Sequence, residues 1–357
     1  MRIAVVHDYF DLFGGGEREI LQVAEGLSRW HDVEIVTGFY NHNNSFSTKI
    51  PIIEIKPKIR KEPFFQSELA WRFSRFDFSK YDAVVSENYW SVFARHKNHM
   101  HHCETPIRPF YARRGFTSLS MHFWQRPFFN TWVDAMMPFE QKAMKSCKVI
   151  FTNSENIKDQ IKLYYGRDDA VVVYPPVELD KHYYKKTGDY FLYVGRMEAM
   201  KRVGLIVEAF KKTDKKVVII GGGPGLDKIK RMAEGYDNIK ITGFVSDKDL
   251  YEYYANSMCQ IHLAWWEDFG AVITQSHASG KPCLTVADGG GSMEIVEEGK
   301  TGWFVRPRVD GVVEKVNYIT SDICRKMKKA CLENAKRFDY EIYIKKVREL
   351  VEGMVSI

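Results

Sequence analysis

Residues 262–305 read HLAWWEDFGAVITQSHASGKPCLTVADGGGSMEIVEEGKTGWFV. The apolar residues at the start and in the middle of this stretch predict two buried strands, with a helix between them that a glycine ends. An acidic loop follows the first strand, and three consecutive glycines follow the second. The predicted elements are a strand ending at Leu263, a loop at 267–270, a helix at 271–279, a strand at 283–286 and a second helix beginning at Ser292. This alternation indicates an α/β fold with a parallel sheet.

The loops of this stretch carry two kinds of ligand-binding group. In open α/β sheets, ligands bind at the loops that follow the carboxyl ends of the strands. Glu267 and Asp268 offer carboxylates to hydroxyl groups. A helix that starts after Gly289–Gly291 would offer backbone N–H groups and a positive dipole end to an anion. The stretch therefore predicts a site for a ligand that has both hydroxyl and phosphate groups, as a nucleotide sugar does.

These residues, in this order, resemble the family-4 glycosyltransferases of the GT-B fold, which are retaining enzymes that use nucleotide-diphospho-sugar donors. The resemblance rests on E-D-F-G at 267–270, A-S-G-K-P at 278–282 and GG..E.V..G.TG at 290–302. It implies that Glu267 contacts hydroxyl groups of the donor sugar, and that Gln275 holds the ribose where the family has a glutamate. A neutral amide still exchanges hydrogen bonds with a diol, but without the added strength of a charge. The resemblance also implies donor contacts from Phe269, Gly270, Gly290, Gly291 and Glu294.

The composition indicates a globular protein large enough for two domains. The chain has 357 residues, of which 45% are hydrophobic and only 12 are proline. The net charge of +6 is modest and no nucleic-acid-binding module is recognisable, so we expect no nucleic-acid partner. The six cysteines lack metal-binding spacing and indicate reduced core residues of a cytosolic protein. No apolar run approaches the ~18 residues of a membrane-spanning helix, and the N-terminal run predicts a strand rather than a signal peptide.

The first half of the chain predicts another dinucleotide-like unit. Residues 2–6 predict a buried strand, and residues 17–29 predict a helix with apolar side chains at helical spacing. Gly14 and Gly15 lie between them, and glycines let the backbone approach a phosphate or sugar closely. The G-G-x-E-R order resembles the donor-facing loop of the same family, which implies donor contacts from both glycines. Further strands are predicted at 33–37, 82–86, 149–152 and 171–174.

The segment from His101 to Arg108 contains a second departure from the family pattern. Its T-P-x-R order resembles a loop in which the family places a histidine near the donor sugar, and Glu104 occupies that position here. Glu104 either binds a sugar hydroxyl or the acceptor nucleophile, or it faces solvent. Arg108 is expected beside the sugar. Adjacent residues on a strand point to opposite faces, so we expect His101 and His102 to be core or solvated residues rather than metal ligands.

Two stretches combine cationic and aromatic residues. Residues 56–75 contain six Lys or Arg and two Glu among aromatic residues. They predict either an amphipathic helix packed on the sheet or a basic surface on an anionic membrane. Residues 108–126 contain four Arg and no acidic residue. They indicate an acceptor-binding surface, with Arg113 beside the acceptor, or else a mobile loop around a partly buried aromatic cluster.

The second half of the chain begins after Pro175-Pro176, which breaks regular structure and predicts a domain boundary. A predicted strand at 190–195 leads directly to Arg196 and, five residues later, to Lys201. This G-R-x4-K pattern resembles the family's clamp for the donor pyrophosphate, and guanidinium and ammonium groups suit that role. Further donor contacts are expected where later strands end, from Gly222 and Phe244.

Together these features predict an α/β protein of the GT-B type, in which two Rossmann-like domains face each other across a cleft. The N-terminal acceptor domain is predicted at 1–177, and a crossing helix at 340–357 completes it. The C-terminal donor domain is predicted at 178–339.

The predicted activity is transfer of a hexose, with mannose as the first choice, from a GDP- or UDP-sugar to a glycan or polyprenyl-linked acceptor. Arg196, Lys201 and Glu267 are the predicted catalytic residues. No metal or other cofactor is expected, because cationic side chains can stabilise the leaving diphosphate. The expected location is the cytoplasm, including the inner face of the membrane. The alternative is a catalytically weak nucleotide-sugar-binding or scaffolding subunit, because Gln275 and Glu104 depart from the family. The G-R-x4-K and E-D-F-G motifs disfavour an epimerase or phosphorylase of the same fold.

Overall fold

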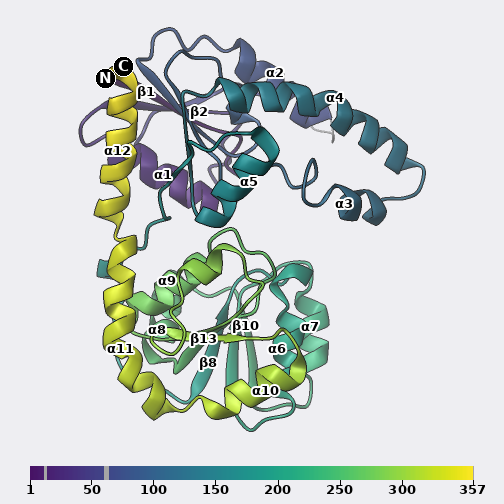
Figure 1. Cartoon of the computed structure of the whole chain (residues 1–357), viewed down its shortest axis with the longest axis vertical. Coiled ribbons are helices and arrows are strands. Elements are labelled where there is room, and N and C mark those ends of the chain that lie inside the picture. The colour runs from purple at the N-terminus through teal and green to yellow at the C-terminus, as the bar shows by residue number, and fades with distance from the viewer. Residues whose placement is uncertain (12–13, 60–63, 357) are drawn as a thin grey trace. The chain divides into compact units, whose positions relative to one another are not determined.

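The computed structural model describes residues 1–11, 14–59 and 64–356. The chain forms two compact units, shown in Figure 1. Unit 1 consists of Met1–Tyr174 and Tyr343–Ile357, and unit 2 consists of Pro175–Ile342. Unit 1 is therefore discontinuous in sequence, because its last helix follows the whole of unit 2.

Unit 1 is built on a parallel sheet of seven strands in the order β3-β2-β1-β4-β5-β6-β7. The interior strand β1, which pairs with β2 and β4, is buried over most of its length, which explains the unbroken apolar run near the N-terminus. The strands are β1 (Arg2–His7), β2 (Asp32–Thr37), β3 (Ile52–Glu54), β4 (Ala83–Glu87), β5 (His99–His102), β6 (Val149–Thr152) and β7 (Val171–Val172).

The helices of unit 1 pack mostly through one apolar face. On α2, for example, Phe65, Leu69 and Phe73 are buried, as expected for an amphipathic helix. Residues 60–63 of the same predicted stretch lie outside the described residues. The helices are α1 (Gly15–Leu27), α2 (Phe64–Arg75), the 3-10 helix η1 (Ser91–Phe93), α3 (Arg114–Ser120), α4 (Gln125–Ser146), α5 (Glu155–Tyr165) and most of α12 (Tyr340–Ser356).

Unit 2 repeats this plan with a parallel sheet of six strands in the order β10-β9-β8-β11-β12-β13. The strands are β8 (Tyr190–Val194), β9 (Lys216–Ile220), β10 (Ile239–Gly243), β11 (Cys259–His262), β12 (Cys283–Val286) and β13 (Gly302–Val305). The α-helices are α6 (Val203–Phe210), α7 (Leu226–Ala233), α8 (Asp247–Asn256), α9 (Ala271–Ala278), α10 (Val309–Tyr318) and α11 (Ser321–Ala335). The 3-10 helices are η2 (Leu179–Lys181), η3 (Ala199–Lys201), η4 (Gly291–Glu294) and η5 (Lys336–Phe338).

The prediction of a helix that begins at Ser292 is wrong, because the chain forms only the four-residue 3-10 helix η4 there. The backbone just before it runs beside the loop after β11, and the Gly291 N–H is used in a hydrogen bond to the Glu267 carbonyl (2.8 Å). The segment is thus held in place by pairing with its neighbour rather than by a helical ladder. A single short turn does not supply the aligned dipole of a helix. The predicted anion site after Gly291 therefore lacks the stabilisation that a helix dipole would give.

The six cysteines are all free and buried, as the sequence predicted. Within the part of the chain that the structure describes, no helix is both long enough and apolar enough to cross a membrane.

Candidate functional site

Three polar side chains of unit 2 meet where the neighbouring strands β8 and β11 end. Lys201 Nζ donates to Glu267 Oε2 over 2.5 Å, and His262 Nε2 lies 3.2 Å from the same oxygen. Lys201 and Glu267 retain 25% and 17% exposure of their side chains, so both remain accessible to a ligand. Burial raises the pKa of Glu267, but its contacts with His262 and Lys201 outweigh this effect and hold that pKa well below its ordinary value. The carboxylate therefore stays ionised and accepts hydrogen bonds.

The backbone around Glu267 is fixed by the loop after β12. The Trp266 N–H donates to the Asp288 carbonyl (3.0 Å), and the Glu267 N–H donates to the Gly289 carbonyl (2.9 Å). A Cβ atom at Gly291 would lie 2.0 Å from the Asp268 carbonyl oxygen, so only glycine permits this close approach. The predicted residues Gly290 and Gly291 thus lie directly beside Glu267, and they set its position.

An ion pair that the sequence analysis missed joins the loops after β8 and β12. Arg202 donates to both carboxylate oxygens of Asp288 over 2.8 and 2.7 Å. Arg202 has a φ of +50°, which is uncommon for a residue with a side chain, and it immediately follows Lys201. This paired contact holds Lys201 toward Glu267. Neither Arg202 nor His262 matched a quoted motif, although a histidine that ends an apolar strand was a visible signal.

Arg196 does not reach the contact between Lys201 and Glu267. Its guanidinium is 70% exposed and pairs with Glu198 on the same loop. Its backbone is anchored, because the Tyr193 hydroxyl donates to the Arg196 carbonyl (3.0 Å). Its role on a diphosphate therefore stays a prediction that requires the side chain to leave Glu198.

The other predicted donor contacts of unit 2 fall into exposed and interior groups. The Phe244 ring is 84% exposed and covers Gly222, where a Cβ atom would lie 2.5 Å from it. The Phe269 ring, in contrast, is buried and packs edge-on against Phe338, with ring centroids 5.6 Å apart. Gly270 has a φ of +102° and precedes α9, and Glu294 lies partly exposed in η4.

Gln275 lies on α9, and its amide oxygen is already engaged. The Tyr254 hydroxyl donates to Gln275 Oε1 over 3.0 Å. Tyr254 is fully buried on α8, so this bond connects the two helices through the interior of unit 2. A ribose held by Gln275 would therefore bind its amide nitrogen or share its amide oxygen with Tyr254.

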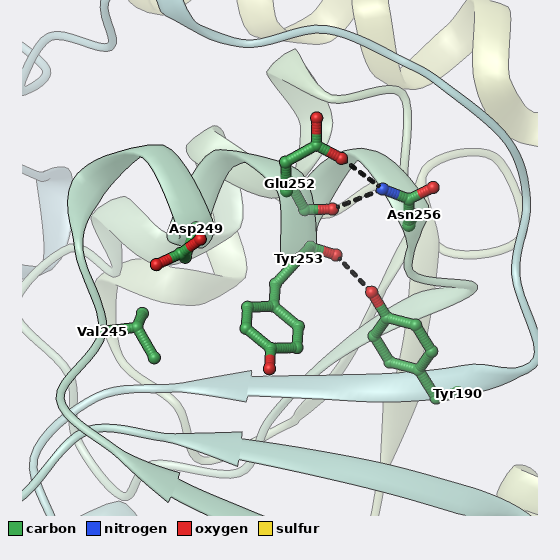
Figure 2. A pocket seen from close by; sticks show the side chains of 6 residues that line it. All are labelled: Tyr190, Val245, Asp249, Glu252, Tyr253 and Asn256. Atoms are coloured by element: carbon green, nitrogen blue, oxygen red, sulfur yellow. Dashed lines mark hydrogen bonds between the residues drawn. The ribbon is translucent and has the colours of Figure 1, made fainter.

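A shallow pocket of about 330 Å³ lies along α8 (Figure 2). Its polar groups largely bond to each other: the Tyr190 hydroxyl donates to the Tyr253 carbonyl (2.8 Å), and Asn256 Nδ2 donates to Glu252 Oε2 (2.9 Å). Tyr190 begins β8, at the end of the strand opposite to Lys201. None of the predicted site residues lines this pocket, and we assign it no ligand.

Three of the predicted residues of unit 1, Gly14, Gly15 and Glu104, lie at the loop that begins α1. Gly14 is the N-cap of α1, and the space beside Gly15 is open. The Glu104 carboxylate lies against the next residue, Gly16, where a Cβ atom would be 3.2 Å from Glu104 Oε1. The loop that carries Glu104 is held by β6, because Asn153 Nδ2 donates to the Glu104 carbonyl (3.1 Å). The structure thus brings Glu104 to the glycine loop, and its contact with a sugar stays a prediction.

The buried acid Asp8 organises the neighbouring loop. Its carboxylate accepts from the backbone N–H groups of Trp90 (3.0 Å) and Ser91 (2.6 Å), and so caps η1. Burial raises the pKa of Asp8 to about 7, and these hydrogen bonds limit the rise.

The two tandem histidines are core residues, as expected. His101 and His102 are buried in β5, and the Ser86 hydroxyl lies 2.8 Å from His101 Nδ1. Among the described residues, no group of three or more His, Cys, Asp or Glu side chains is arranged to hold a metal ion.

The predicted acceptor arginines Arg108 and Arg113 lie in the segment that leads into α3. Arg113 precedes α3, and its backbone N–H donates to the Arg108 carbonyl (2.8 Å), so these two residues close one turn. Arg114 is paired with Asp134 over 2.7 Å. The stretch 108–126, interpreted above as an acceptor surface or a mobile loop, contains the short helix α3, which buries none of its residues.

Comparison with known families assigns both halves of the chain. The family model described as Glycosyl transferases group 1 matches residues 176–338, and that described as Glycosyltransferase Family 4 matches residues 13–181. Since the two models together span nearly the whole chain, it belongs to the glycosyltransferases that they describe.

Individual proteins agree with this assignment. O-antigen chain mannosyltransferase C of Escherichia coli is 26% identical over 199 residues, which cover 50% of this chain and 53% of that protein. The match thus spans about half the length of that relative. Sucrose-phosphate synthase from Thermosynechococcus elongatus superimposes with a TM-score of 0.82 at 14% identity, and covers 100% and 99% of the two chains. Anabaena Alr3699/HepE in complex with UDP-glucose gives 0.75 at 14% identity, and covers 99% and 100%. These structural similarities confirm the predicted GT-B fold class.

Proposed function

We propose that this protein transfers a hexose, with retention of configuration, from a nucleotide-diphospho-sugar to a glycan or polyprenyl-linked acceptor. The observation that carries the proposal is the contact between Lys201 and Glu267 at the carboxyl ends of β8 and β11. It places an ammonium and an ionised carboxylate side by side, at the edge of the sheet where α/β proteins bind ligands.

The two groups suit the two ends of the scissile bond. Glu267 accepts hydrogen bonds from hydroxyl groups of the donor sugar, and its ionised state strengthens them. Lys201 offsets the negative charge that develops on the departing diphosphate. Arg196 adds a second cation when its exposed side chain turns from Glu198 to the phosphate. We propose that these cations provide the charge stabilisation without a metal or other cofactor.

Mannose is the first candidate for the transferred sugar, because the E. coli relative is named as a mannosyltransferase. The structural neighbour crystallised with UDP-glucose makes a uridine donor the second candidate. Purified protein should be incubated with a panel of GDP- and UDP-hexoses and candidate acceptors, and products should be detected by mass spectrometry. We expect transfer with one donor class, and a loss of about 100-fold or more in Lys201→Met.

The matched control is Lys211→Met, which removes a lysine of unit 2 that pairs with Glu208 on α6. This variant should transfer sugar at the wild-type rate. Tight nucleotide binding without turnover for any donor would refute the transferase proposal. That outcome would instead favour the scaffolding subunit that Gln275 and Glu104 suggest.

A lipid-linked acceptor is supported by the aromatic face of α3 and α4. We define this face by the exposed residues Phe116, Leu119, Phe123, Trp124 and Phe128. It lies where α3 and the start of α4 project from the rest of unit 1 (Figure 1). The nearby cations Arg113 and Arg126 favour an anionic bilayer, since the first acidic residue on α4 is Asp134. We therefore propose attachment to the inner face of the cytoplasmic membrane through this face.

Binding to vesicles tests this attachment. Sedimentation with vesicles of phosphatidylcholine and phosphatidylglycerol should be lost when Phe116, Phe123 and Trp124 are replaced by Ser, and it should weaken with salt. The control Leu163→Ser changes an equally exposed apolar residue on α5 and should bind normally. Unchanged binding of the triple variant would contradict the assignment.

A further inference from the structure

Two carboxylates of unit 1 lie beside the same glycine of the loop that begins α1. A Cβ atom at Gly16 would lie 3.4 Å from Glu87 Oε1 and 3.2 Å from Glu104 Oε1. Glu87 ends β4 and is fully buried, whereas Glu104 follows β5 and is partly exposed. Since both carboxylates lie within 3.4 Å of one point, they face the same small space, which Gly16 leaves open by lacking a side chain.

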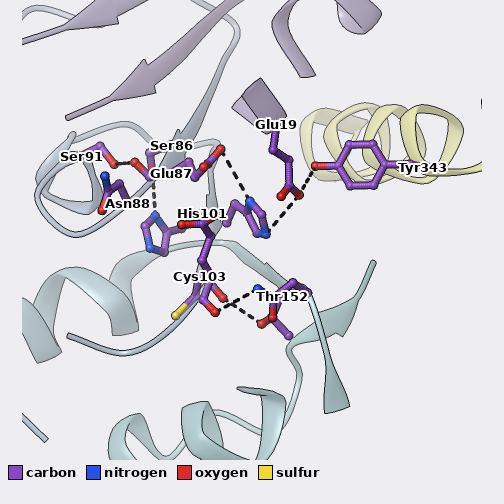
Figure 3. Close-up of polar contacts among 12 residues, drawn as sticks. Glu19, Ser86, Glu87, Asn88, Ser91, His101, Cys103, Thr152 and Tyr343 are labelled. Atoms are coloured by element: carbon purple, nitrogen blue, oxygen red, sulfur yellow. Dashed lines mark hydrogen bonds and ion pairs between the residues drawn. The ribbon is translucent and has the colours of Figure 1, made fainter. Parts of the chain in front are cut away.

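Glu87 brings a buried group without a hydrogen-bond partner to this space. Neither of its carboxylate oxygens has such a partner within the part of the chain that the structure describes. Behind it, His102 Nδ1 lies 3.7 Å from Glu87 Oε2, and His102 Nε2 lies 3.8 Å from Glu19 Oε1. Tyr343 donates to Glu19 over 2.9 Å (Figure 3). A buried oxygen without a hydrogen-bond partner lowers the stability of the fold. We therefore expect Glu87 to form a hydrogen bond in the space beside Gly16.

Electrostatics determine which form Glu87 adopts. Burial raises the pKa of Glu87 well above its ordinary value, and the charge of Glu104 raises it further. Two carboxylates that face one point do not readily ionise together, because each negative charge opposes the other. The titratable groups that face Glu87 are Asp8 after β1, Glu17 and Glu19 on α1, His102 on β5, Glu104 after β5 and Tyr343 on α12.

We propose that Glu87 and Glu104 share one proton, and that this pair binds a hydroxyl group of a sugar substrate beside Gly16. Glu87 is the positioning residue: it carries the proton and donates it in a hydrogen bond to one oxygen of Glu104. The other oxygen of Glu104 then accepts from the sugar hydroxyl. The pair thus favours a neutral, hydroxyl-rich ligand, and it gives Glu104 a function in the T-P-x-R loop. The sugar-binding part of this inference rests on the proposed transferase function.

The shared proton can be measured without turnover. In infrared difference spectra between the wild type and Glu87→Gln, the C=O stretch of a protonated carboxylic acid should be lost at pH 7. In Glu104→Gln, the same band should titrate at a lower pH than in the wild type, because removal of the neighbouring negative charge lowers the pKa of Glu87. Glu140→Gln is the matched control: Glu140 is also buried in unit 1, and its pKa is raised to about 7 by burial, but its carboxylate binds Tyr111 and Tyr165.

Kinetics test the binding role. Glu104→Gln should raise, about 10-fold, the KM for the substrate that carries the bound hydroxyl. Separate titrations of donor and acceptor identify which of the two substrates this is. In the wild type, the transfer rate should fall at alkaline pH as the shared proton is lost. Glu87→Gln cannot lose a proton, so this alkaline limb should disappear, whereas Glu140→Gln should retain it. Thermal unfolding of each variant verifies the fold.

The outcomes separate the two proposals. If no donor supports transfer by the wild type, the proposed function fails, and the infrared titration still decides whether the proton is shared. If the wild type transfers sugar but the Glu87→Gln profile keeps its alkaline limb, the carboxylate pair is refuted. A carboxylic-acid band that titrates identically in wild type and Glu104→Gln would also overturn it.

Discussion

Replacing Lys201 with Met removes the ammonium group that lies 2.5 Å from Glu267 and keeps most of the side-chain volume. At an effective dielectric constant of about 20, the direct attraction at that distance is about 7 kcal/mol, and desolvation of the two groups cancels much of it. Because both side chains are mostly buried, we expect the free energy of unfolding of unit 2 to fall by about 2–4 kcal/mol at pH 7.

The size of this loss should depend on pH in a defined direction. In the folded protein, the pKa of Glu267 lies below its ordinary value of 4.5. The stability from the ionised carboxylate is therefore present above the unfolded pKa, and it is lost as pH falls through the folded pKa. Lys201→Met raises the folded pKa, so the variant has less of this stability to lose. The difference between the two proteins should consequently shrink as the pH falls below 4.5.

Urea unfolding provides the assay, with tryptophan fluorescence as the probe, to which Trp265 and Trp266 beside Glu267 contribute. Lys211→Met serves as the control, because its partner Glu208 is far more exposed than Glu267 and the pair should contribute less than about 1 kcal/mol. A loss of stability as large at pH 3 as at pH 7 would refute the electrostatic explanation. So would a loss no larger than that of the control.

Three further substitutions examine other parts of unit 2. Arg196→Ala should lower the transfer rate about 100-fold while leaving urea unfolding unchanged, because the side chain is exposed; an unchanged rate would exclude it from the diphosphate site. Gln275→Glu should keep or raise activity, since a carboxylate also accepts from Tyr254, and complete loss of activity would contradict a ribose contact. Gly291→Ala should lower the free energy of unfolding by about 2–4 kcal/mol and also impair transfer, because its Cβ would lie 2.0 Å from the Asp268 carbonyl; stability and activity equal to wild type would show that the loop adjusts freely.

Much of the fold could be predicted because buried parallel strands have a simple signature. The runs that became β1, β8 and β12 are apolar without alternation, and turn residues bound them. The strand β5 was harder to recognise, since it reads His-Met-His-His. Its histidines are buried because tertiary contacts satisfy some of them, and local sequence carries no sign of such contacts.

The helix α4 was not predicted from the sequence. The 22-residue helix α4 contains Pro138, which ordinarily argues against a helix interior. Its buried residues are few and widely spaced, so its apolar stripe is faint in the sequence. At Ser292 the opposite error arose, because a glycine run before polar residues resembles a helix start, whereas pairing with the Glu267 loop decides the conformation.

The candidate site was predictable only where the chemistry is local in sequence. Lys201 and Glu267 each belong to a recognisable motif, but their direct contact depends on the adjacency of β8 and β11. The Arg202–Asp288 pair joins residues 86 positions apart, and Glu87 and Glu104 come from different strands to lie beside Gly16. Such contacts between residues far apart in the chain follow from the order of the strands in the sheet, and the spacing of residues along the sequence does not reveal them.

The discontinuity of unit 1 has a consequence for how the molecule is made. A ribosome delivers every residue of unit 2 before Tyr343, the first residue of the returning segment, is synthesised. Until then Glu19 lacks its hydrogen bond from the Tyr343 hydroxyl, and the surface that Ile344, Val347 and Val351 later cover is exposed to solvent. Unit 2 can therefore fold during translation, whereas unit 1 is complete only once α12 has been made. A chain that stops before α12 therefore contains a folded unit 2 and an incomplete unit 1.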